Sequence, residues 1–321
     1  MLDTVTLASI QSARARLQGI IYVTPVMESK VLSEIAGMPL YFKCENLQRT
    51  GAFKLRGSYN KLSQLSAQER SVGVITASSG NSGCGTAFAG KLLGLRVVVV
   101  TSNNPAPAKK AALEAYGAEI HYAGQMSSER LARVDELSAE FGLTVIHAYD
   151  DPQVIAGQGT IGLEMLEQMP DVEQIVVQIG GGGLLGGIST ALRTSGYRGR
   201  IVGVEPEVSA RMTYSLAQGQ ASALPLQQWA VSVGDGINSN KIGNYTYPLI
   251  REYVDQVVTV SEAELLEATK LQIEQGKMFV EPSGAATFAA ALAGKLQSGL
   301  KTICLISGGN SDIHSLARLM S

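Results

Sequence analysis

The sequence predicts an α/β protein with mostly parallel sheets, and three observations support this fold class. Short apolar runs rich in β-branched residues alternate with longer helical patterns along almost all of the chain, as in parallel strands joined by covering helices. Several of these runs are apolar throughout, which is typical of strands buried on both faces. Three loops rich in glycine or serine directly follow expected strands, at the sheet edge where α/β proteins bind ligands.

The expected elements alternate along the chain. Strands are expected at Leu40–Cys44, Gly73–Thr76, Arg96–Thr101, Glu119–Tyr122, Thr144–His147, Gln174–Ile179, Arg200–Val204 and Thr302–Ile306. Helices are expected at Ala106–Tyr116, Ser127–Phe141, Gly157–Gln168, Ser261–Glu274 and Gly284–Leu296. The first 17 residues also have a capped amphipathic pattern that predicts a helix.

Composition argues against several classes of function. The chain has 321 residues, a formal net charge of −2, 45% hydrophobic residues and 17% charged residues. This near-neutral balance disfavours nucleic acid and anionic membranes as partners, since both require clustered Lys and Arg. No apolar run approaches the roughly 20 residues that span a bilayer, and no secretory signal is visible. Cys44, Cys84 and Cys304 are widely spaced and fit neither a disulfide framework nor a zinc cluster, so we expect a cytoplasmic protein.

Four consecutive glycines, Gly180 to Gly183, follow an expected strand and predict a phosphate site. Without Cβ atoms, their N–H groups can approach an anion closely, and the following helix N-terminus adds partial positive charge. A dinucleotide site is the alternative interpretation. Gly181, Gly183 and Gly186 satisfy G-x-G-x-x-G, and Glu205 follows the next strand about where a ribose-binding acid would lie.

Lys54 is the candidate nucleophile. It lies between Phe53 and Leu55, with Gly51 and Gly57 nearby. A lysine that forms a Schiff base must be neutral to attack an aldehyde, and an apolar setting lowers its pKa from roughly 10.4. For an isolated Phe-Lys-Leu, a solvated lysine between core residues would be the better explanation, so the assignment depends on the accompanying motifs.

Four motifs, GAFKLRG, SSGNSG, GGGG and SGGN, occur in an order and at separations that resemble the fold-type II pyridoxal phosphate enzymes. The segments KCENLQRTGAFKLRG, DDPQVIAGQGTIGLE, GVEP, GDG, VEPSGA and SGGN resemble specifically the threonine/serine dehydratase and serine racemase group. The similarity covers nearly the whole chain. It implies a tryptophan synthase β-like fold of two three-layer α/β/α domains. It also implies a lyase that converts a 3-hydroxy amino acid, threonine or serine, into a 2-oxo acid and ammonia by β-elimination.

The resemblance implies where pyridoxal phosphate binds. Lys54 would form the Schiff base, Asn81 would donate to the 3′-oxygen, and Ser307 would face the pyridine nitrogen. A neutral hydroxyl at Ser307 leaves that nitrogen largely unprotonated, which suits β-elimination. The implied cofactor-binding residues are Phe53, Lys54, Asn81, Gly180, Gly181, Gly182, Gly183, Leu184 and Ser307.

The resemblance also implies catalytic and substrate-binding residues. Lys54, once displaced by the substrate amine, would remove the α-proton as general base. Ser79 would face the opposite side of the cofactor, where reprotonation would give racemisation. Helix capping also explains Ser78 and Ser79, and it uses the same donors. The implied substrate contacts are Ser78, Ser79, Gly80, Asn81, Ser82, Arg130 and Ser239, although a surface helix also explains Arg130.

Other functions stay open beside the dehydratase and the racemase. The segment SSGNSGCG is closer to the TSGNTG loop of cysteine synthases, which use pyridoxal phosphate for β-replacement. Ser82 stands where the dehydratases and racemases usually have His. The lysine segment and SGGN favour the dehydratases. A dinucleotide-dependent oxidoreductase, based on the glycine loop and Glu205, is the alternative outside the pyridoxal phosphate class.

In the racemases a divalent cation is held by an acid in GVEP, a carbonyl four residues later and an Asp two residues further. The corresponding positions here are Glu205, Ser209 and Arg211. Because a guanidinium is no metal ligand, Arg211 is expected to pair with Glu205 in place of the ion. Mg²⁺ or a monovalent cation at Glu205 and Ser209 remains the alternative.

The family layout implies two domains with the cofactor between them. Residues 72–148 would form a small mobile substrate domain, and residues 1–71 and 149–321 a large pyridoxal phosphate-binding domain. Closure of the small domain would bring the serine-rich loop onto the substrate and exclude water. The resemblance also implies a homodimer or homotetramer that binds a small amino-acid substrate, with no nucleic acid or membrane partner.

Overall fold

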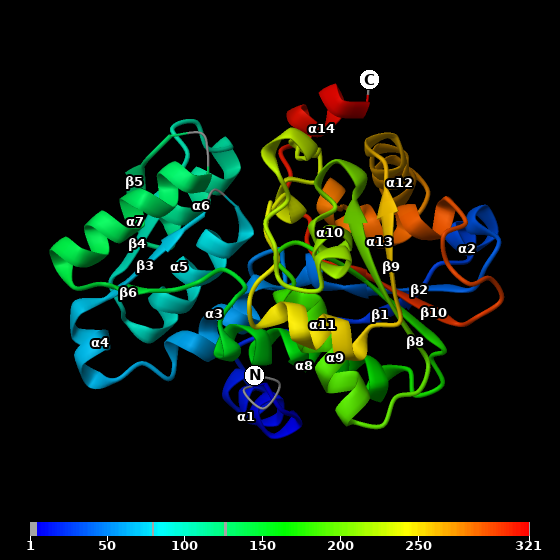
Figure 1. Ribbon diagram of the computed structural model, residues 1–321, viewed down its shortest axis with the longest axis horizontal. Coiled ribbons are helices and arrows are strands. Elements are labelled where there is room, and N and C mark those ends of the chain that lie inside the picture. Colours follow the sequence, from blue (N-terminus) through cyan, green and yellow to red (C-terminus); the bar gives the residue numbers. More distant parts are fainter. Residues whose placement is uncertain (1–4, 79, 125–126, 321) are drawn as a thin grey trace.

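The computed structural model describes residues 5–320 except 79, 125 and 126, and its strands form two sheets (Figure 1). The six-stranded sheet has the spatial order β1 (Val26–Glu28), β2 (Leu40–Cys44), β10 (Thr302–Ile306), β7 (Gln174–Gln178), β8 (Arg200–Pro206), β9 (Gln256–Val260). The four-stranded sheet has the order β5 (Glu119–Tyr122), β4 (Val97–Thr101), β3 (Val74–Ala77), β6 (Thr144–Val145). In Figure 1 the smaller sheet lies on the left and the larger one on the right.

Neighbouring strands are parallel throughout, except that β1 runs antiparallel to β2. Parallel neighbours require crossover connections, which the helices provide. The expected α/β class with mostly parallel sheets is therefore confirmed.

Helices account for most of the remaining chain. They are α1 (Leu7–Leu17), α2 (Lys30–Ala36), α3 (Lys54–Leu62), α4 (Ala67–Val72), α5 (Asn81–Leu93), α6 (Pro107–Ala115), α7 (Ser127–Phe141), α8 (Pro152–Gln168), α9 (Gly183–Thr194), α10 (Arg211–Gln218), α11 (Thr246–Tyr253), α12 (Glu262–Glu274), α13 (Pro282–Leu292) and α14 (Ile313–Met320). Short 3₁₀ helices are η2 (Glu45–Leu47), η3 (Glu207–Ser209), η4 (Leu226–Gln228) and η5 (Asp235–Ile237).

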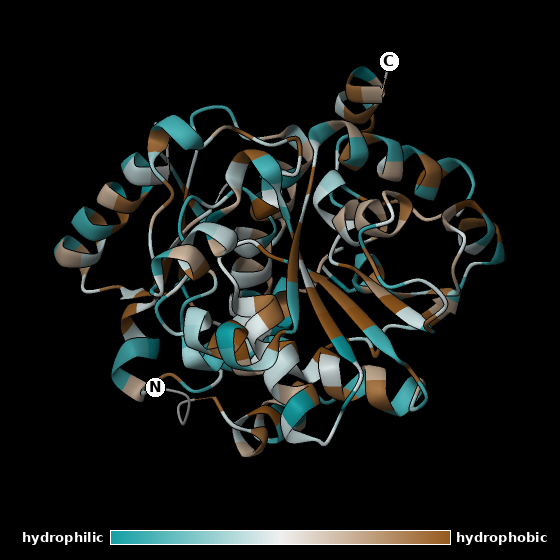
Figure 2. Cartoon of the chain, turned by 45° about the vertical axis from the view of Figure 1, so that its right-hand side comes forward, coloured by the Kyte–Doolittle hydropathy of each residue, from teal (hydrophilic) through white to brown (hydrophobic). Residues whose placement is uncertain are grey.

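Both faces of the large sheet are buried, as the alternation along β10 shows. Cys304 and Ile306 belong to a core cluster that includes α12 and α13, whereas Ile303 and Leu305 belong to a second cluster with α8 and α9. Successive side chains of a strand point to opposite faces, so a strand between two helical layers must be apolar throughout. Figure 2 shows the corresponding brown strands, while many outer helices alternate between teal and brown.

Helices α3 and α8 cross closely at glycines and join the two sheets. A Cβ atom on Gly157 of α8 would lie 2.6 Å from the carbonyl oxygen of Arg56 in α3, so this contact requires glycine. Helix α3 also packs against α5, which covers the small sheet. The N-terminus of α3, where Lys54 lies, is therefore held between the two sheets.

A buried ion network fixes α3 in this position. The Arg56 guanidinium donates to Glu45 at 2.8 and 2.9 Å and to Glu164 of α8 at 2.6 and 2.9 Å. Lys43 Nζ lies 2.6 Å from the same Glu164 carboxylate. Two buried cations thus face two buried carboxylates, which offsets the cost of removing these charges from water.

The sequence located most elements but missed some of them. The expected strands at Leu40–Cys44, Glu119–Tyr122 and Thr302–Ile306 have the observed bounds, whereas β1 and β9 were not expected. Helix α8 begins at Pro152 rather than at the expected Gly157. Among the described residues, no helix combines the length and apolarity needed to cross a membrane.

Candidate active site

Lys54 begins α3 and is half-buried. Its Nζ donates to the carbonyl oxygen of Ala148 at 3.2 Å and lies 5.0 Å from the centre of the Phe53 ring. Burial lowers the pKa of Lys54 to about 8, and the negative charge of Glu281 partly opposes this shift. The amine is thus more often neutral than an ordinary lysine, as a nucleophile toward an aldehyde must be.

The glycine loop connects β7 to α9. Gly182 is the N-cap of α9 with φ +94, and no side chain in the described part of the chain caps the helix. The first N–H groups of a helix have no intrahelical acceptor, so this end of α9 can bind an anion. A Cβ on Gly181 would lie 2.3 Å from the ring of Tyr149, and one on Gly183 2.7 Å from the Tyr149 carbonyl. Only glycine fits at these two positions.

Lys54 and the glycine loop therefore meet on the same short segment. Ala148 accepts the hydrogen bond from Lys54, and the next residue, Tyr149, packs on Gly181 and Gly183. Leu184, which follows the loop, is buried.

The end of β10 brings the SGGN motif to the lysine. The carbonyl oxygen of the buried Ser307 accepts a hydrogen bond of 3.1 Å from the Phe53 amide, and Ala52 forms an isolated bridge with Gly308. Ser307 is thus adjacent to the turn that carries Lys54.

The serine-rich loop enters α5 directly beside Lys54. A Cβ on Gly85 would lie 3.1 Å from the Lys54 Cβ. The Ser78 hydroxyl accepts from the amides of Gly80 at 3.2 Å and Gly83 at 2.8 Å, so it supports the first turn of α5. Ser82 is buried within this turn, and Ser79 lies outside the described residues.

Asn81 is bound to two residues that the sequence did not single out as site residues. Its Nδ2 donates to Glu281 at 2.6 Å, and its Oδ1 accepts from Asn310 at 2.9 Å. Burial, followed by the nearby charge of Asp235, raises the pKa of Glu281 to about 7. Both residues occur in motifs that carried the resemblance, VEPSGA and SGGN, which was the signal available for finding them.

Lys109 and Asp235 form an ion pair of 2.7 Å between α6 and η5. Helix α6 covers the small sheet, whereas η5 contacts α13 of the large one. This ion pair therefore connects the two sheets next to Glu281. The charge of Asp235, and to a smaller extent that of Glu281, raises the pKa of Lys109. The sequence did not predict this pair.

Ser239 and Arg130 occupy different surroundings. Ser239 Oγ lies 3.5 Å from the hydroxyl of Tyr149, which places it near the glycine loop. Arg130 is half-buried on α7, a helix that contacts β3, β4 and β6 of the small sheet, and burial lowers its pKa.

Glu205 is fully buried and already bound. Its carboxylate accepts from the amides of Met212 at 2.9 Å and Thr213 at 2.8 Å, and lies 3.8 Å from Arg211 Nε. Burial lowers the pKa of Arg211 to about 10, against the opposing charge of Glu205. The expected Arg211–Glu205 pair is confirmed. The dinucleotide interpretation is wrong in its central element, because this carboxylate has no open side for a ribose.

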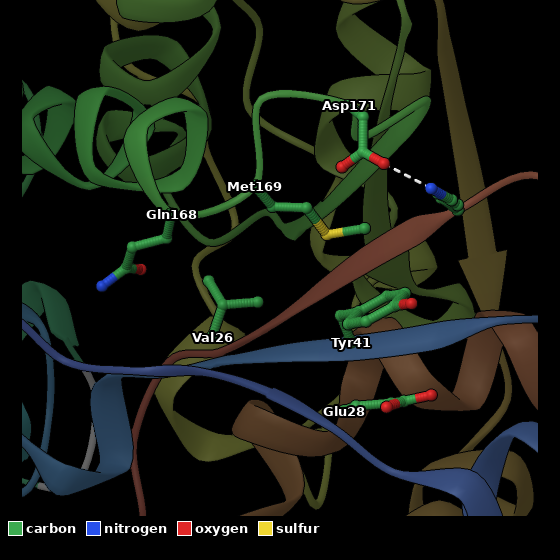
Figure 3. A pocket seen from close by; sticks show the side chains of 7 residues that line it. Val26, Glu28, Tyr41, Gln168, Met169 and Asp171 are labelled. Atoms are coloured by element: carbon green, nitrogen blue, oxygen red, sulfur yellow. Dashed lines mark hydrogen bonds and ion pairs between the residues drawn. The ribbon is translucent and has the colours of Figure 1, made fainter.

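Two of the cavities at the surface of the described chain bear on the location of the site. One of about 270 Å³ is bordered by β1, β2 and the Asp171–Lys301 ion pair, and contains none of the expected site residues (Figure 3). The other, of about 300 Å³, adjoins the site and is lined in part by Gly51, Lys109 and Asn310.

The described residues fit a cofactor that carries an aldehyde and a phosphate. Lys54 provides an amine of lowered pKa, and α9 provides an uncapped N-terminus. Glu281 Oε2 is buried and, within the described part of the chain, has no hydrogen-bond partner. A buried polar atom without a partner at this position is consistent with a site that binds a polar ligand.

Comparisons with known proteins agree with this fit. The family model described as pyridoxal-phosphate dependent enzyme matches residues 17–308. The chain is 43% identical over 310 residues to an L-threonine ammonia-lyase of Geobacter sulfurreducens, covering 96% of this chain and 76% of that protein. It is 37% identical to a serine racemase of Schizosaccharomyces pombe, covering 98% and 97% of the two chains.

Among solved structures, maize serine racemase superimposes with a TM-score of 0.92 at 35% identity, over 99% of this chain and 97% of that one. The expected fold and family are thus confirmed. The chain belongs to the family of pyridoxal-phosphate dependent enzymes, in the fold-type II group that includes threonine dehydratases and serine racemases.

Proposed function

We propose that this protein is a pyridoxal phosphate-dependent dehydratase that converts threonine or serine into a 2-oxo acid and ammonia by β-elimination. The observation that carries the proposal is Lys54, an amine whose pKa is lowered to about 8 by burial. Lys54 contacts Ala148, and the glycine loop packs against the next residue, Tyr149. Relatives named L-threonine ammonia-lyase and serine racemase support a 3-hydroxy amino acid as the substrate class.

Pyridoxal phosphate, when bound, supplies an aldehyde that captures amines and a ring that accepts the electron pair left by breaking the Cα–H bond. Lys54 Nζ would hold the cofactor and, as a free amine, would be the base that takes the α-proton. A pKa of about 8 leaves a useful fraction of this amine neutral near neutral pH. The Ala148 carbonyl at 3.2 Å orients Nζ.

We infer the other cofactor contacts from the resemblance to the fold-type II enzymes, and their positions around Lys54 support them. The N–H groups of the glycine loop and of Leu184 would bind the phosphate, and Phe53 would lie beside the ring. The resemblance implies that Ser307 would face the pyridine nitrogen, and its hydrogen bond with the Phe53 amide supports this. Asn81 would donate to the 3′-oxygen with the amide hydrogen that Glu281 does not accept.

The proposed substrate contacts are centred on the loop from Ser78 to Ser82. Its amides at the N-terminus of α5 would bind the substrate carboxylate. Ser239 would contribute from the side of Tyr149, and Arg130 from α7. The loop belongs to the proposed small domain, residues 72–148, which contains all four strands of the smaller sheet.

The proposal is tested by assaying 2-oxo acid and ammonia from serine, threonine and other 3-hydroxy amino acids. Threonine or serine should give both products in equal amounts, and Lys54→Ala should give neither. The assay is repeated with an added thiol, which a β-replacement enzyme would incorporate. A thioether product, or no 2-oxo acid from any member of the panel, would overturn the proposal.

Racemisation is the second candidate activity, favoured by the TM-score of 0.92 to maize serine racemase. Ser79 would reprotonate the face opposite Lys54. We predict that Ser79→Ala spares elimination of L-serine more than formation of D-serine, measured by chiral chromatography. Equal loss of both activities would contradict the assignment of the two faces.

We also propose a cytoplasmic homodimer or homotetramer. All three cysteines are buried and unpaired, which suits a reducing compartment. The exposed apolar side chains include Tyr22, Val23 and Leu47, between 51% and 68% exposed, and a subunit interface would cover such groups. Analytical ultracentrifugation distinguishes the dimer and tetramer from a monomer, which would contradict this part.

A further inference from the structure

Arg211 lies beneath the glycine loop with its guanidinium fully buried. Nε donates to the carbonyl oxygen of Gly180 at 2.9 Å, and Nη2 donates to that of Ile179. Nη1 donates to both the carbonyl and the hydroxyl oxygen of Ser209. One side chain thus gathers three backbone carbonyls, two of them at the start of the loop.

The charge of Arg211 is balanced by Glu205 at 3.8 Å from its Nε. The Glu205 carboxylate also accepts hydrogen bonds from the first turn of α10. The donors are the amides of Met212 and Thr213 and the Thr213 hydroxyl at 2.7 Å. A buried arginine is stable only if its charge is paired and its N–H groups have acceptors. Both conditions are met here, because Glu205 pairs with the charge and the N–H groups donate to Ile179, Gly180 and Ser209.

A metal ion does not fit these residues. Ca²⁺ requires six to eight oxygen ligands and Mg²⁺ a near-octahedral set. The carboxylate of Glu205 and the carbonyl of Ser209 are already bound to N–H donors, and the third position carries the positive charge of Arg211. In this chain the Arg211 guanidinium thus takes the place of the cation that the racemases bind.

The contacts also affect how the loop presents its amides. In a trans peptide the C=O and the following N–H point in opposite directions. The carbonyls of Ile179 and Gly180 point toward Arg211, so the N–H groups of Gly180 and Gly181 point away from the guanidinium. Both amides are thereby held ready for an anion on the opposite side of the loop.

We propose that Arg211 is a permanent internal cation that positions the phosphate-binding glycine loop, and that the protein binds its cofactor without a divalent metal ion. Arg211 is a positioning residue, since it acts through the backbone of the loop. The inference rests on the proposed pyridoxal phosphate site, but it concerns metal requirement and cofactor affinity rather than turnover.

The first experiment uses the unmodified protein. Its dissociation constant for pyridoxal phosphate, from absorbance and fluorescence titration, and its Tm are measured after dialysis against a chelator and again with Mg²⁺, Ca²⁺ or Mn²⁺. Both quantities should stay unchanged, and calorimetry should detect no binding of the metals alone. Loss of cofactor affinity in the chelator with recovery on adding a metal would overturn the proposal, whatever the variants do.

The second experiment exchanges the cation. Arg211→Met keeps the bulk but removes the charge, so cofactor affinity should fall by about tenfold or more, with or without metal. Arg211→Asp places a carboxylate beside Glu205 and the Ser209 carbonyl, and Mg²⁺, Ca²⁺ or Mn²⁺ should then restore affinity. The exposed Arg251 on α11 provides the control, Arg251→Met.

Wild-type affinity in Arg211→Met under chelation would overturn the positioning role. If neither Arg211 variant folds, the metal dependence of the wild-type Tm and of its cofactor affinity still decides the question. If the wild type binds no pyridoxal phosphate at all, the proposed function fails, and the wild-type Tm with and without metal remains a separate test of the internal cation.

Discussion

At the residue scale, the protonation of Lys54 depends on an acid that lies far away in the sequence. Burial favours the neutral amine, and the charge of Glu281 favours the ammonium form. Glu281 is itself only partly ionised near neutral pH, because burial and the charge of Asp235 raise its pKa to about 7. The two groups together determine how much reactive amine is present near neutral pH.

Replacing Glu281 therefore has a predictable sign. The negative charge of Glu281 raises the pKa of Lys54, so Glu281→Gln should lower it. Only the neutral amine attacks an aldehyde. The rate at which the cofactor-free protein captures pyridoxal phosphate should rise with pH around a midpoint of about 8 in the wild type, and around a lower midpoint in the variant.

Stopped-flow absorbance across the neutral and alkaline range measures both midpoints. Glu274→Gln, at an exposed position in α12, is the control and should leave the midpoint where it is. A midpoint that moves to higher pH in Glu281→Gln would show that Glu281 does not act on Lys54 as described.

At the element scale, the junction of α3 with α8 positions the N-terminus that carries Lys54. Two features hold it: the close approach at Gly157 and the buried network around Arg56. Arg56 lies two residues after Lys54, so any displacement of α3 would move the amine relative to the Ala148 carbonyl.

Arg56→Met should destabilise the fold by about 3–5 kcal/mol, because among the described residues it leaves Lys43 as the one cation paired with the buried Glu45 and Glu164. The matched control is Arg14→Met. Arg14 pairs with Glu167 of the same helix α8, but both side chains are about half exposed, so the loss should stay below about 1 kcal/mol. Urea unfolding measures both, and equal losses would contradict the importance of the buried network.

At the scale of the whole molecule, the two sheets are joined across the site by side-chain contacts. Lys109 binds Asp235, and the Arg49 guanidinium lies 4.9 Å from the centre of the Phe88 ring. The Asp235 side chain is 61% exposed, whereas that of Lys109 is 10% exposed, so water screens the ion pair from the Asp235 side only. Such a contact suits a boundary that must admit substrate and then exclude water.

A double-mutant cycle tests this link. Lys109→Met and Asp235→Asn should each raise KM, and the double variant should be little worse than either one, since both remove the same contact. The coupling should be about fivefold in KM, or about 1 kcal/mol, which is the upper end for exposed pairs, because the Lys109 side of this pair is buried. Lys110→Met, which breaks the exposed Lys110–Glu114 pair within α6, should leave KM unchanged. Independent, multiplicative effects would exclude the link.

The fold was largely predictable because buried parallel strands are apolar throughout. β4 and β10 are examples, and both were expected within one residue of their bounds. β9 is only partly buried along its length, and β1 has three residues and depends on pairing with β2. Neither carries a local signal of comparable strength. The start of α8 did carry a local signal, because Asp151 is the N-cap and Pro152 follows it, but the periodicity alone does not reveal this.

The site was predictable where chemistry is local in sequence. The glycine quartet predicts an anion site within a few residues, whereas Lys54 was identified only together with the accompanying motifs. The environment of Lys54 was harder to predict from the sequence, because it depends on contacts between segments that are distant in the sequence. Asn81 and Glu281 are 200 positions apart, and Lys109 and Asp235 are 126 apart. Folding, not local pattern, creates these contacts.

Borohydride reduction of the cofactor-loaded protein tests the role of Lys54 most directly. Reduction makes the bond between an amine and the aldehyde permanent, and peptide mass spectrometry then locates it. We predict loss of the visible absorption band and a pyridoxyl group on Lys54, with neither in Lys54→Ala. A label on another lysine such as Lys109, or a protein that stays colourless with pyridoxal phosphate, would contradict the assignment.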